Sequence, residues 1–343
     1  MVRMANIGDV AARAGVGIGT VSRVLNGSTQ VRPETRLKVR EAMQQLGYQP
    51  GRIAKARKVD RNGLVGVLVP FFDEPSSYQR LRGIVQGVQR HDMEIVLYNV
   101  DAPDRVRRRL LELPSQPLDG LIVISLPLQS EEGDRLARAP FPTVLVDTQH
   151  PALPSVVVDD RNGGRLATEH LLSLGHTRIA FVGEPARNPF SFVSSPLREQ
   201  GYRAALRAAG VEASASLVKH GPHLRSAARQ LSIELLTLDD PPTAIVAASD
   251  VQAIGILEAA EQMKLSVPRD LSVMGYDDID LAAFSGLTTI RQQLELSGQR
   301  GAEILTAAIA TNSRPQPFVE ELPLEVVVRS TTGRNLRGSR KDR

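Results

Sequence analysis

The sequence predicts an α/β protein in which a small helical head precedes a larger body of doubly wound parallel sheets. Residues 7–26 contain two short helical patterns joined by a glycine turn, and short apolar runs alternate with helical patterns from Leu64 onward. The alternation restarts after Asp160, which indicates a body of two lobes rather than one. At 343 residues the chain is long enough for a head and more than one further domain.

The two N-terminal helical patterns are typical of a helix-turn-helix. Each has one apolar face, formed by Ile7, Val10 and Ala14 in the first and by Val21, Val24 and Leu25 in the second. Gly15 in the turn permits the sharp change of direction that this motif requires. The outer face of the second helix suits base edges and phosphates better than a protein core. Its residues are Ile18, Gly19, Thr20, Ser22 and Arg23. The pattern alone is also compatible with an ordinary helical hairpin.

The charge distribution supports a nucleic-acid partner for the head. Residues 1–60 carry 11 Lys or Arg and 4 Asp or Glu, and residues 329–343 carry 6 basic residues and 1 acidic residue. Because the whole chain has a net charge of only +4, the segment between them is acidic. A basic head on an acidic body is the electrostatic pattern of a DNA-binding protein whose other part has a different task.

The composition excludes several other classes of protein. The chain has no cysteine, so disulfides, thiolate metal sites and cysteine nucleophiles are absent. No run of about 18 apolar residues predicts a membrane span, and Asn6, Gly8 and Asp9 interrupt the apolar core that a signal peptide needs. No nucleophile elbow, metal-ligand spacing, GxGxxG or Walker sequence occurs. We therefore expect a cytoplasmic protein that is not an enzyme, needs no cofactor and has no membrane partner.

The body alternates predicted strands and helices. The strands are expected at 64–69, 94–98, 120–124, 143–146 and 156–158, and after the restart at 179–182, 217–219, 244–247 and 271–274. The helices are expected near 77–91, 105–113, 162–174, 198–209, 224–237 and 251–264. Continuous apolar strands with intervening helices imply parallel sheets that are covered on both faces.

The segment 6–58 resembles the headpiece of the LacI/GalR family of bacterial transcriptional repressors. The most specific matches are TVSRVLN at 20–26 and LGYQP at 46–50. The resemblance continues through the body to about residue 330, in ATEHLLSLGHTRIAFVG at 167–183, the Arg-x-x-Gly-Tyr step from Arg198, SDVQAIGILEAA at 249–260, LSVMGYDDIDLA at 271–282 and the segment 287–292.

This resemblance implies a three-helix head and a core of two periplasmic-binding-protein-like lobes. Three chain crossings are expected near 160, 290 and 322, with an effector in the cleft between the lobes at the carboxyl ends of the strands. A homodimer is expected, because two heads reading a pseudo-palindromic DNA operator share the two-fold axis of the protein.

The resulting division of the chain has four parts. Residues 1–50 form the DNA-binding headpiece, 51–61 a hinge or linker, 62–330 the effector-binding and dimerisation core, and 331–343 a basic disordered tail. Within the core, lobe one comprises about 62–159 and 291–322, and lobe two about 160–290 and 323–330. The tail has no leucine heptads, so a tetramerising coiled coil is not expected.

The resemblance also implies how the head reads DNA, with the second helix in the major groove. Arg23 can pair with guanine or bind a phosphate, with the base as the expected partner, and Ile18 is expected to touch a thymine methyl. Thr20, Ser22 and Asn26 are expected to contact phosphates or to position the helix, although capping and surface solvation explain each of them equally well.

The linker departs from the family pattern. The family usually has Ala-Arg-x-Leu here, with the leucine wedged between base pairs in the minor groove. In this chain Ala54 and Lys55 match, but Arg57 stands at the leucine position. One hypothesis is that Arg57 enters a narrow, A·T-rich minor groove with weaker kinking, and the alternative is a basic linker that only adds phosphate attraction.

The effector residues are carried over from the family one by one. Arg198 and Asp277 are the expected polar clamps, and Asp147, Ser249 and Gln292 secondary contacts. Arginine with several carboxylates fits the hydroxyls of a polyol, while interlobe salt bridging is the alternative role. The family's aromatic pair in the first strand–helix loop is displaced here, so Phe72 or Tyr78 is the candidate to stack on a sugar, with plain core packing as the alternative.

Together these features predict a sequence-specific DNA-binding repressor controlled by a small molecule, most plausibly a sugar. The alternatives are a purine or nucleoside effector, or a protein partner that docks on the body. A solute-binding protein is disfavoured by the basic head and the missing signal peptide.

Overall fold

The computed structural model describes residues 7–25, 28, 30–46 and 62–335, and the chain divides into two compact units, 1–63 and 64–343. Each unit is described by itself. The predictions for Asn26, Lys55 and Arg57 lie outside the described residues.

The first unit contains three helices, α1 (Ile7–Ala14), α2 (Ile18–Leu25) and α3 (Pro33–Gln45). Its core is formed by the predicted faces of α1 and α2 packed against α3, and its buried members are Val10, Ala11, Val21, Val24, Val31, Val39 and Ala42. Gly15 has a φ of 66° in the turn between α1 and α2, a conformation that glycine adopts without strain. The predicted helix-turn-helix is confirmed.

The second unit contains two six-stranded sheets, one in each lobe. The lobe-one sheet has the order β11-β5-β4-β3-β1-β2, with β1 (Leu64–Pro70), β2 (Glu94–Val100), β3 (Gly120–Ile124), β4 (Thr143–Val146), β5 (Ser155–Val157) and β11 (Val319–Glu321). The lobe-two sheet has the order β12-β10-β9-β8-β6-β7, with β6 (Ile179–Gly183), β7 (Val218–His220), β8 (Ala244–Ala247), β9 (Ser272–Asp277), β10 (Thr288–Arg291) and β12 (Glu325–Val327). All neighbours are parallel except β10 and β12. The predicted pair of parallel-sheet lobes is confirmed.

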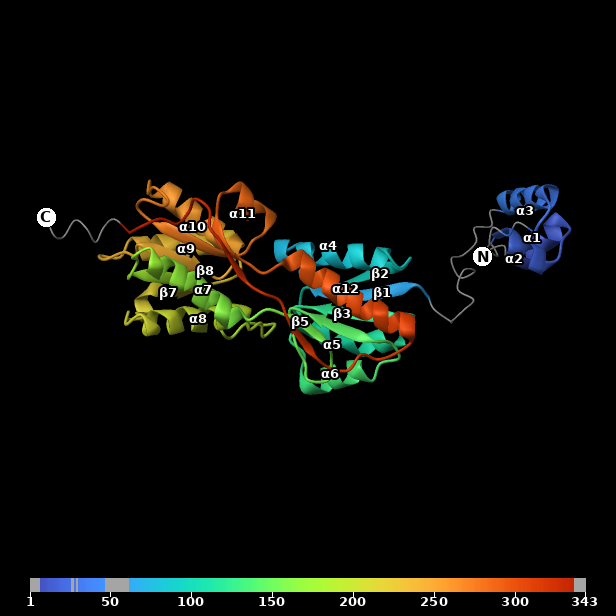
Figure 1. The fold of residues 1–343 in the computed structure, drawn as a ribbon, viewed down its shortest axis with the longest axis horizontal. Helices are drawn as coiled ribbons and strands as arrows, with labels where there is room; N and C mark the ends of the chain where they lie inside the picture. Colours follow the sequence, from blue (N-terminus) through green and yellow to red (C-terminus); the bar gives the residue numbers. More distant parts are fainter. Residues whose placement is uncertain (1–6, 26–27, 29, 47–61, 336–343) are drawn as a thin grey trace. The chain divides into compact units, whose positions relative to one another are not determined.

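Helices cover both faces of each sheet (Figure 1). In lobe one, α4 (Pro75–Gln89) and α12 (Leu294–Thr311) pack on one face, and α5 (Pro103–Glu112) and α6 (Ser130–Ala137) on the other. In lobe two, α7 (Asp160–Ser173) and α8 (Ser194–Ala208) cover one face, and α9 (Arg225–Leu236) and α10 (Asp250–Gln262) the other. The short α11 (Asp280–Phe284) follows β9, and single 3-10 turns occupy Leu113–Ser115 and Ala215–Leu217. Residues of the central strands β1, β3, β6 and β8 are buried on both sides, which explains their continuous apolar runs.

The chain passes between the sheets three times. It leaves lobe one after β5, returns after β10, and leaves again between β11 and β12. These crossings place the carboxyl ends of both sheets at the junction of the lobes, where α4 of lobe one meets residues that follow β9 and β10 of lobe two.

Two sequence expectations need correction in the second unit. The strand expected at 271–274 continues to Asp277, because Gly275 lets the strand pass against Asp250, whose Oδ1 lies 2.2 Å from where a Cβ would stand. The tail expected to be disordered from 331 is ordered as far as Asn335, because its backbone and side chains hydrogen-bond to the body. Thr331 is buried and its hydroxyl donates to the Val273 carbonyl over 2.8 Å, and the Asn335 N–H donates to the Leu174 carbonyl over 2.9 Å. Among the described helices, none is long and apolar enough to span a bilayer.

Candidate effector site and DNA-reading helix

Strained backbone marks the carboxyl ends of the strands in both lobes. Phe71 after β1, Ser125 after β3 and Asp147 after β4 have φ values of 47°, 53° and 61°. Asp277 at the end of β9 and Asp278 next to it have φ values of 125° and 60°. Residues other than glycine adopt these values at a cost, and such residues concentrate at functional sites. The edge where the lobes meet is therefore the first candidate for a binding site.

Arg198 forms the lobe-two part of this site. It projects from α8, its Nε donates to Asp160 Oδ1 over 2.7 Å, and one terminal nitrogen lies 3.6 Å from Asp277 Oδ1. That nitrogen also donates to the Ala248 carbonyl over 2.6 Å. The close approach of α7 and α8 depends on Gly164, where a Cβ would stand 2.0 Å from the Arg198 carbonyl oxygen.

Burial affects the ionisation of Asp160, Asp277 and Arg198. It raises the pKa of Asp160 and of Asp277, and the charge of Arg198 opposes that rise at both carboxyls. At Arg198 burial acts to lower the pKa, but Asp160, Tyr276 and Asp277 outweigh it and raise the pKa above its ordinary value. The arginine is therefore the fixed charge around which the carboxyls are arranged.

Lobe one supplies Asp147 and a residue that the sequence analysis missed, Arg80. Asp147 accepts a hydrogen bond from the Ser125 hydroxyl over 2.6 Å and pairs with a terminal nitrogen of Arg80 at 2.7 Å. The same nitrogen of Arg80 donates to Gln292 Oε1 over 2.8 Å. Gln292 Nε2 in turn donates to Asp277 Oδ1.

These contacts form one continuous series from lobe one to lobe two, which we call the interlobe polar chain. Its members are Ser125, Asp147, Arg80, Gln292, Asp277, Arg198 and Asp160. Four of the predicted effector residues, Arg198, Asp277, Asp147 and Gln292, are thus brought together. In this structure they bind one another, as the interlobe salt-bridging alternative describes.

The sequence does contain a signal for Arg80. It stands four and eight residues before Ile84 and Val88 on α4, and all three are buried. An arginine in the apolar i, i+4, i+8 series of a helix is unusual, because burial of a charge requires a specific partner.

The remaining predicted effector residues, Ser249, Phe72 and Tyr78, are not members of the interlobe polar chain. The Ser249 hydroxyl caps α10 by accepting from the Gln252 N–H over 3.2 Å. Phe72 is 44% exposed, and its N–H donates to Asn99 Oδ1 over 3.2 Å. Tyr78 is 55% exposed and lies in a separate apolar groove described below.

A different set of aromatic rings joins the lobes. The Phe71 ring lies edge-on to Phe190 with centroids 5.1 Å apart, and Phe190 stacks on Phe192 at 5.2 Å. Phe190 and Phe192 belong to the segment before α8 in lobe two, yet they pack against the lobe-one core around Leu68. The sequence analysis did not find these two residues, because their loop has no periodic pattern.

A histidine with two carboxylates also links the lobes. His223 Nδ1 lies 2.6 Å from Glu184 Oε1 in lobe two, and Nε2 lies 3.9 Å from Glu74 Oε2 in lobe one. Burial acts to lower the pKa of His223, but the hydrogen bond to Glu184 and the charges of Glu184, Glu74 and Asp277 together outweigh it, so that the pKa is raised. Burial acts to raise the pKa of Glu184, but the hydrogen bonds from His223 and Ser195 and the charges of His223 and Arg198 together outweigh it, so that the pKa is lowered. Burial raises the pKa of Glu74.

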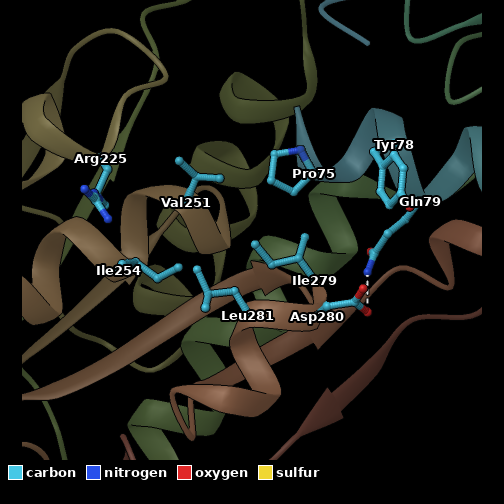
Figure 2. A pocket seen from close by; sticks show the side chains of 9 residues that line it. All are labelled: Pro75, Tyr78, Gln79, Arg225, Val251, Ile254, Ile279, Asp280 and Leu281. Carbon is cyan, nitrogen blue, oxygen red and sulfur yellow. Dashed lines mark hydrogen bonds between the residues drawn. The ribbon is translucent and has the colours of Figure 1, made fainter. Parts of the chain in front are cut away.

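Two cavities flank the contact between α4 and α11, where Gln79 Nε2 donates to Asp280 Oδ1 over 2.8 Å (Figure 2). One is an apolar groove of about 240 Å³, lined by Pro75, Tyr78, Gln79, Arg225, Val251, Ile254, Ile279, Asp280 and Leu281 (Figure 2). The other is a polar cavity of about 260 Å³ that reaches Asp277 of the interlobe polar chain. Its lining is mostly charged and comprises Gln79, Arg82, Asp277, Asp278, Asp280, Arg291, Gln293, Leu294, Glu295 and Leu296.

In the head, four of the predicted DNA-reading residues lie on α2. Ile18 is 56% exposed and Arg23 is exposed, whereas Thr20 and Ser22 are half-buried beside the core residues Val21 and Val24. The described residues contain no group of three or more His, Asp or Glu side chains arranged to hold a metal ion.

Comparisons with known proteins agree with both units. Residues 6–51 match the family model described as bacterial regulatory proteins, lacI family, and residues 168–332 match the periplasmic binding protein-like domain. The ribose operon repressor of Escherichia coli (strain K12) is 31% identical over 327 residues, which cover 94% of this chain and 98% of that protein. The HTH-type transcriptional regulator CelR of Thermobifida fusca is 33% identical over 333 residues, with 94% and 96% covered.

Solved structures of lacI family regulators are also similar to this chain. A Lac repressor dimer bound to operator and the anti-inducer ONPF is 29% identical with a TM-score of 0.79, covering 96% of this chain and 100% of that chain. A LacI family transcriptional regulator from Enterococcus faecium with bound ribose is 28% identical with a TM-score of 0.70, covering 79% and 98%. With a helix-turn-helix head, two parallel-sheet lobes and full-length relatives of this kind, the chain belongs to the lacI family of bacterial regulatory proteins and is a DNA-binding transcriptional repressor.

Proposed function

We propose that a sugar bound between the two lobes sets the affinity of this repressor for its operator DNA. The observation that carries the proposal is the interlobe polar chain, in which Arg198, Asp277, Asp147 and Gln292 meet at the strained carboxyl ends of the strands. Carboxylates and guanidinium groups bind hydroxyls well, because the first accept and the second donate hydrogen bonds. A regulator with bound ribose and a CelR–cellobiose complex are among the similar structures.

The coupling to DNA rests on the position of the site. A ligand that binds groups from both lobes stabilises one relative arrangement of the lobes, and it changes DNA affinity only as far as it prefers that arrangement. In the head, we assign α2 to the major groove, with Arg23 on a guanine, Ile18 on a thymine methyl, and Thr20 and Ser22 on phosphates or in helix positioning. A protein that acts on chromosomal operators works in the cytoplasm.

The protein is further proposed to act as a homodimer through the apolar groove of Figure 2. Both lobes contribute exposed apolar side chains there, including Tyr78 of α4 and Leu281 of α11, and Phe284 at the end of α11 is 89% exposed. A second copy of this chain is the occupant we assign to it. An isologous dimer brings two heads to a pseudo-palindromic site, and a similar repressor is described as a dimer bound to operator.

A purine or nucleoside is the second candidate effector. The stacked rings of Phe190 and Phe192, with Phe71 at their edge, provide an aromatic surface at the lobe junction on which a flat base can stack. Two PurR repressors, from Mannheimia succiniciproducens and Haemophilus influenzae, are also similar to this chain, at 29% and 31% identity.

The test is fluorescence anisotropy with an operator selected from a random DNA pool, at fixed salt. The expected result is a shift of about 5–150-fold in operator affinity with one member of a panel of mono- and disaccharides. Arg198→Ala is expected to abolish the shift, whereas Arg203→Ala, which loses only the ion pair with Glu199 on the same helix, is expected to retain it. Operator binding that responds to nucleobases and to no sugar would overturn the sugar assignment in favour of the purine.

A further inference from the structure

Arg80 is the one arginine of the interlobe polar chain that comes from lobe one. It lies on α4 with 3% of its surface exposed, and a single terminal nitrogen makes both of its contacts, to Asp147 and to Gln292. Its Nε is buried and has no hydrogen-bond partner among the described residues. A buried donor without an acceptor is unfavourable, so an acceptor brought by a ligand would gain a hydrogen bond at this atom.

The charges around Arg80 limit what that ligand can be. The interlobe polar chain contains two arginines and three aspartates, Asp147, Asp160 and Asp277. The adjoining polar cavity adds Asp278, Asp280 and Glu295 but only Arg82 and Arg291. Carboxylates thus outnumber guanidinium groups in both places.

Each of these four arginines already lies 2.7 Å from a carboxylate. The pairs are Arg80–Asp147, Arg198–Asp160, Arg82–Glu295 and Arg291–Asp278. An anionic ligand at one of these arginines lies close to the carboxylate with which that arginine is already paired, and in the buried interlobe polar chain the two like charges repel each other strongly. A hydroxyl group accepts from the arginine and donates to the carboxylate at the same time, and it adds no charge beside the pair.

We propose that Arg80 is a specificity-determining residue of the interlobe site and selects an uncharged polyhydroxylated ligand against its phosphorylated or carboxylated counterparts. The inference rests on the proposed function, because it takes the interlobe polar chain as the effector site. Arg80 acts through two features. Its Nε offers a donor to a ligand hydroxyl, and Asp147 already balances its charge, so that a phosphate there would add negative charge next to a carboxylate.

The experiment compares matched neutral and charged probes by isothermal titration calorimetry on the full chain. The probes are ribose with ribose 5-phosphate, glucose with glucose 6-phosphate, and cellobiose with cellobionate. At least one neutral sugar is expected to bind, with its charged counterpart at least about 10-fold weaker. Equal or tighter binding of a charged probe overturns the proposal, and so does the absence of binding by all three neutral sugars.

Variants separate selectivity from stability. Arg80→Met is expected to lower the affinity for the neutral sugar by about 10-fold or more. Asp147→Asn, which removes the carboxylate that holds Arg80, is expected to raise the affinity for the phosphorylated probe relative to the neutral one. Arg105→Met is the control, because it loses only the exposed pair with Asp101 inside lobe one, and both affinities should stay unchanged.

The selectivity is the ratio of the affinity for the neutral probe to the affinity for its charged counterpart. A change of this ratio cannot come from a loss of stability alone. If Arg80→Met does not fold, the affinity ratio is measured in Arg80→Lys and Asp147→Asn instead. A ratio equal to that of the wild type in both of these variants overturns the role of Arg80. Operator binding is measured on the same preparations. A protein that binds operator but prefers the charged probes defeats this inference only, whereas a protein that binds no operator defeats the proposed function.

Discussion

The guanidinium of Arg198 lies over the face of Tyr276, 3.6 Å from the centroid of the ring. This contact, together with the bond to Asp160, fixes a buried cation between the last residues of β9 and the start of α7. Gly163 makes room for the tyrosine, since a Cβ there would stand 2.1 Å from the phenol oxygen. Gly163, Arg198 and Tyr276 are distant in the sequence but pack together in the fold. Removal of the Arg198 charge at the centre of this group is therefore expected to lower the free energy of unfolding.

Arg198→Ala is expected to lower the free energy of unfolding of the body by about 3–5 kcal/mol, because it leaves the buried Asp160 and Asp277 without their cation. Urea denaturation followed by circular dichroism measures this. Arg203→Ala on the same helix is the control and should change the free energy by less than about 1 kcal/mol, since its pair with Glu199 is partly exposed. A loss of less than about 1 kcal/mol for Arg198→Ala would show that the pair is not needed for stability.

Gly83→Ala is expected to destabilise lobe one by about 1–3 kcal/mol or more. The α4 and α12 helices cross at this point, and a Cβ on Gly83 would stand 2.0 Å from the Glu295 carbonyl oxygen. The effect is measured as a shift of the urea midpoint with unchanged slope. Gln89→Ala, at an exposed position of α4, should shift the midpoint little, and an equal shift in both variants would refute the packing argument.

The His223–Glu184 pair is expected to make stability depend on pH. Because the pKa of His223 is raised on folding, its contribution is complete below the unfolded value near 6.5 and is lost as the pH rises through the folded pKa. Because the pKa of Glu184 is lowered, its contribution is present above about 4.5 and is lost as the pH falls through the folded pKa. The pair thus stabilises the fold in the window between these limits.

We expect urea midpoints to fall between pH 6 and pH 8, and to fall less in His223→Gln. The exposed His91→Gln is the control and should keep the wild-type slope. The other groups that face His223 are Glu74, which also lies across the lobe boundary, and Asp277. A wild-type slope in His223→Gln would assign the pH dependence to one of these instead.

Arg23→Ala is expected to weaken operator binding by about 1–3 kcal/mol and to relax the base preference at one position of each half-site, as for the loss of a bidentate contact to guanine. Anisotropy with single-base operator variants measures both effects. Arg13→Ala removes an arginine that bonds Gln45 within the head, and it should not change the base preference. A uniform loss across all operator variants, with a smaller salt slope, would place Arg23 on a phosphate.

Leu281→Asp is expected to convert the dimer into a monomer at micromolar concentration, because it places a charge in the apolar groove proposed as the interface. Sedimentation velocity gives the mass directly. Leu111→Asp changes a 60%-exposed leucine on α5, away from the groove, and should leave the mass unchanged. A dimer that survives Leu281→Asp would move the interface elsewhere.

Much of the architecture is already present in local patterns. The faces of α1 and α2, the turn at Gly15 and the apolar strands of both sheets follow from periodicity and composition, because neighbours within about four residues decide helix and strand. The charge contrast between head and body and the strings TVSRVLN and LGYQP indicate a DNA-binding repressor. Of the effector candidates, Arg198, Asp277, Asp147 and Gln292 do meet in space.

Only the tertiary structure decided which side chains satisfy one another. Arg80 reaches Gln292 across 212 positions, and Phe190 meets Phe71 from a loop without a repeating pattern. Thr331 is ordered because its hydroxyl bonds the distant Val273 carbonyl, not because of any signal in the tail itself. A charged side chain is buried at low cost only where it pairs with a partner of opposite charge. That partner is brought close by the folding of the whole body, so a short segment of sequence does not reveal the pair.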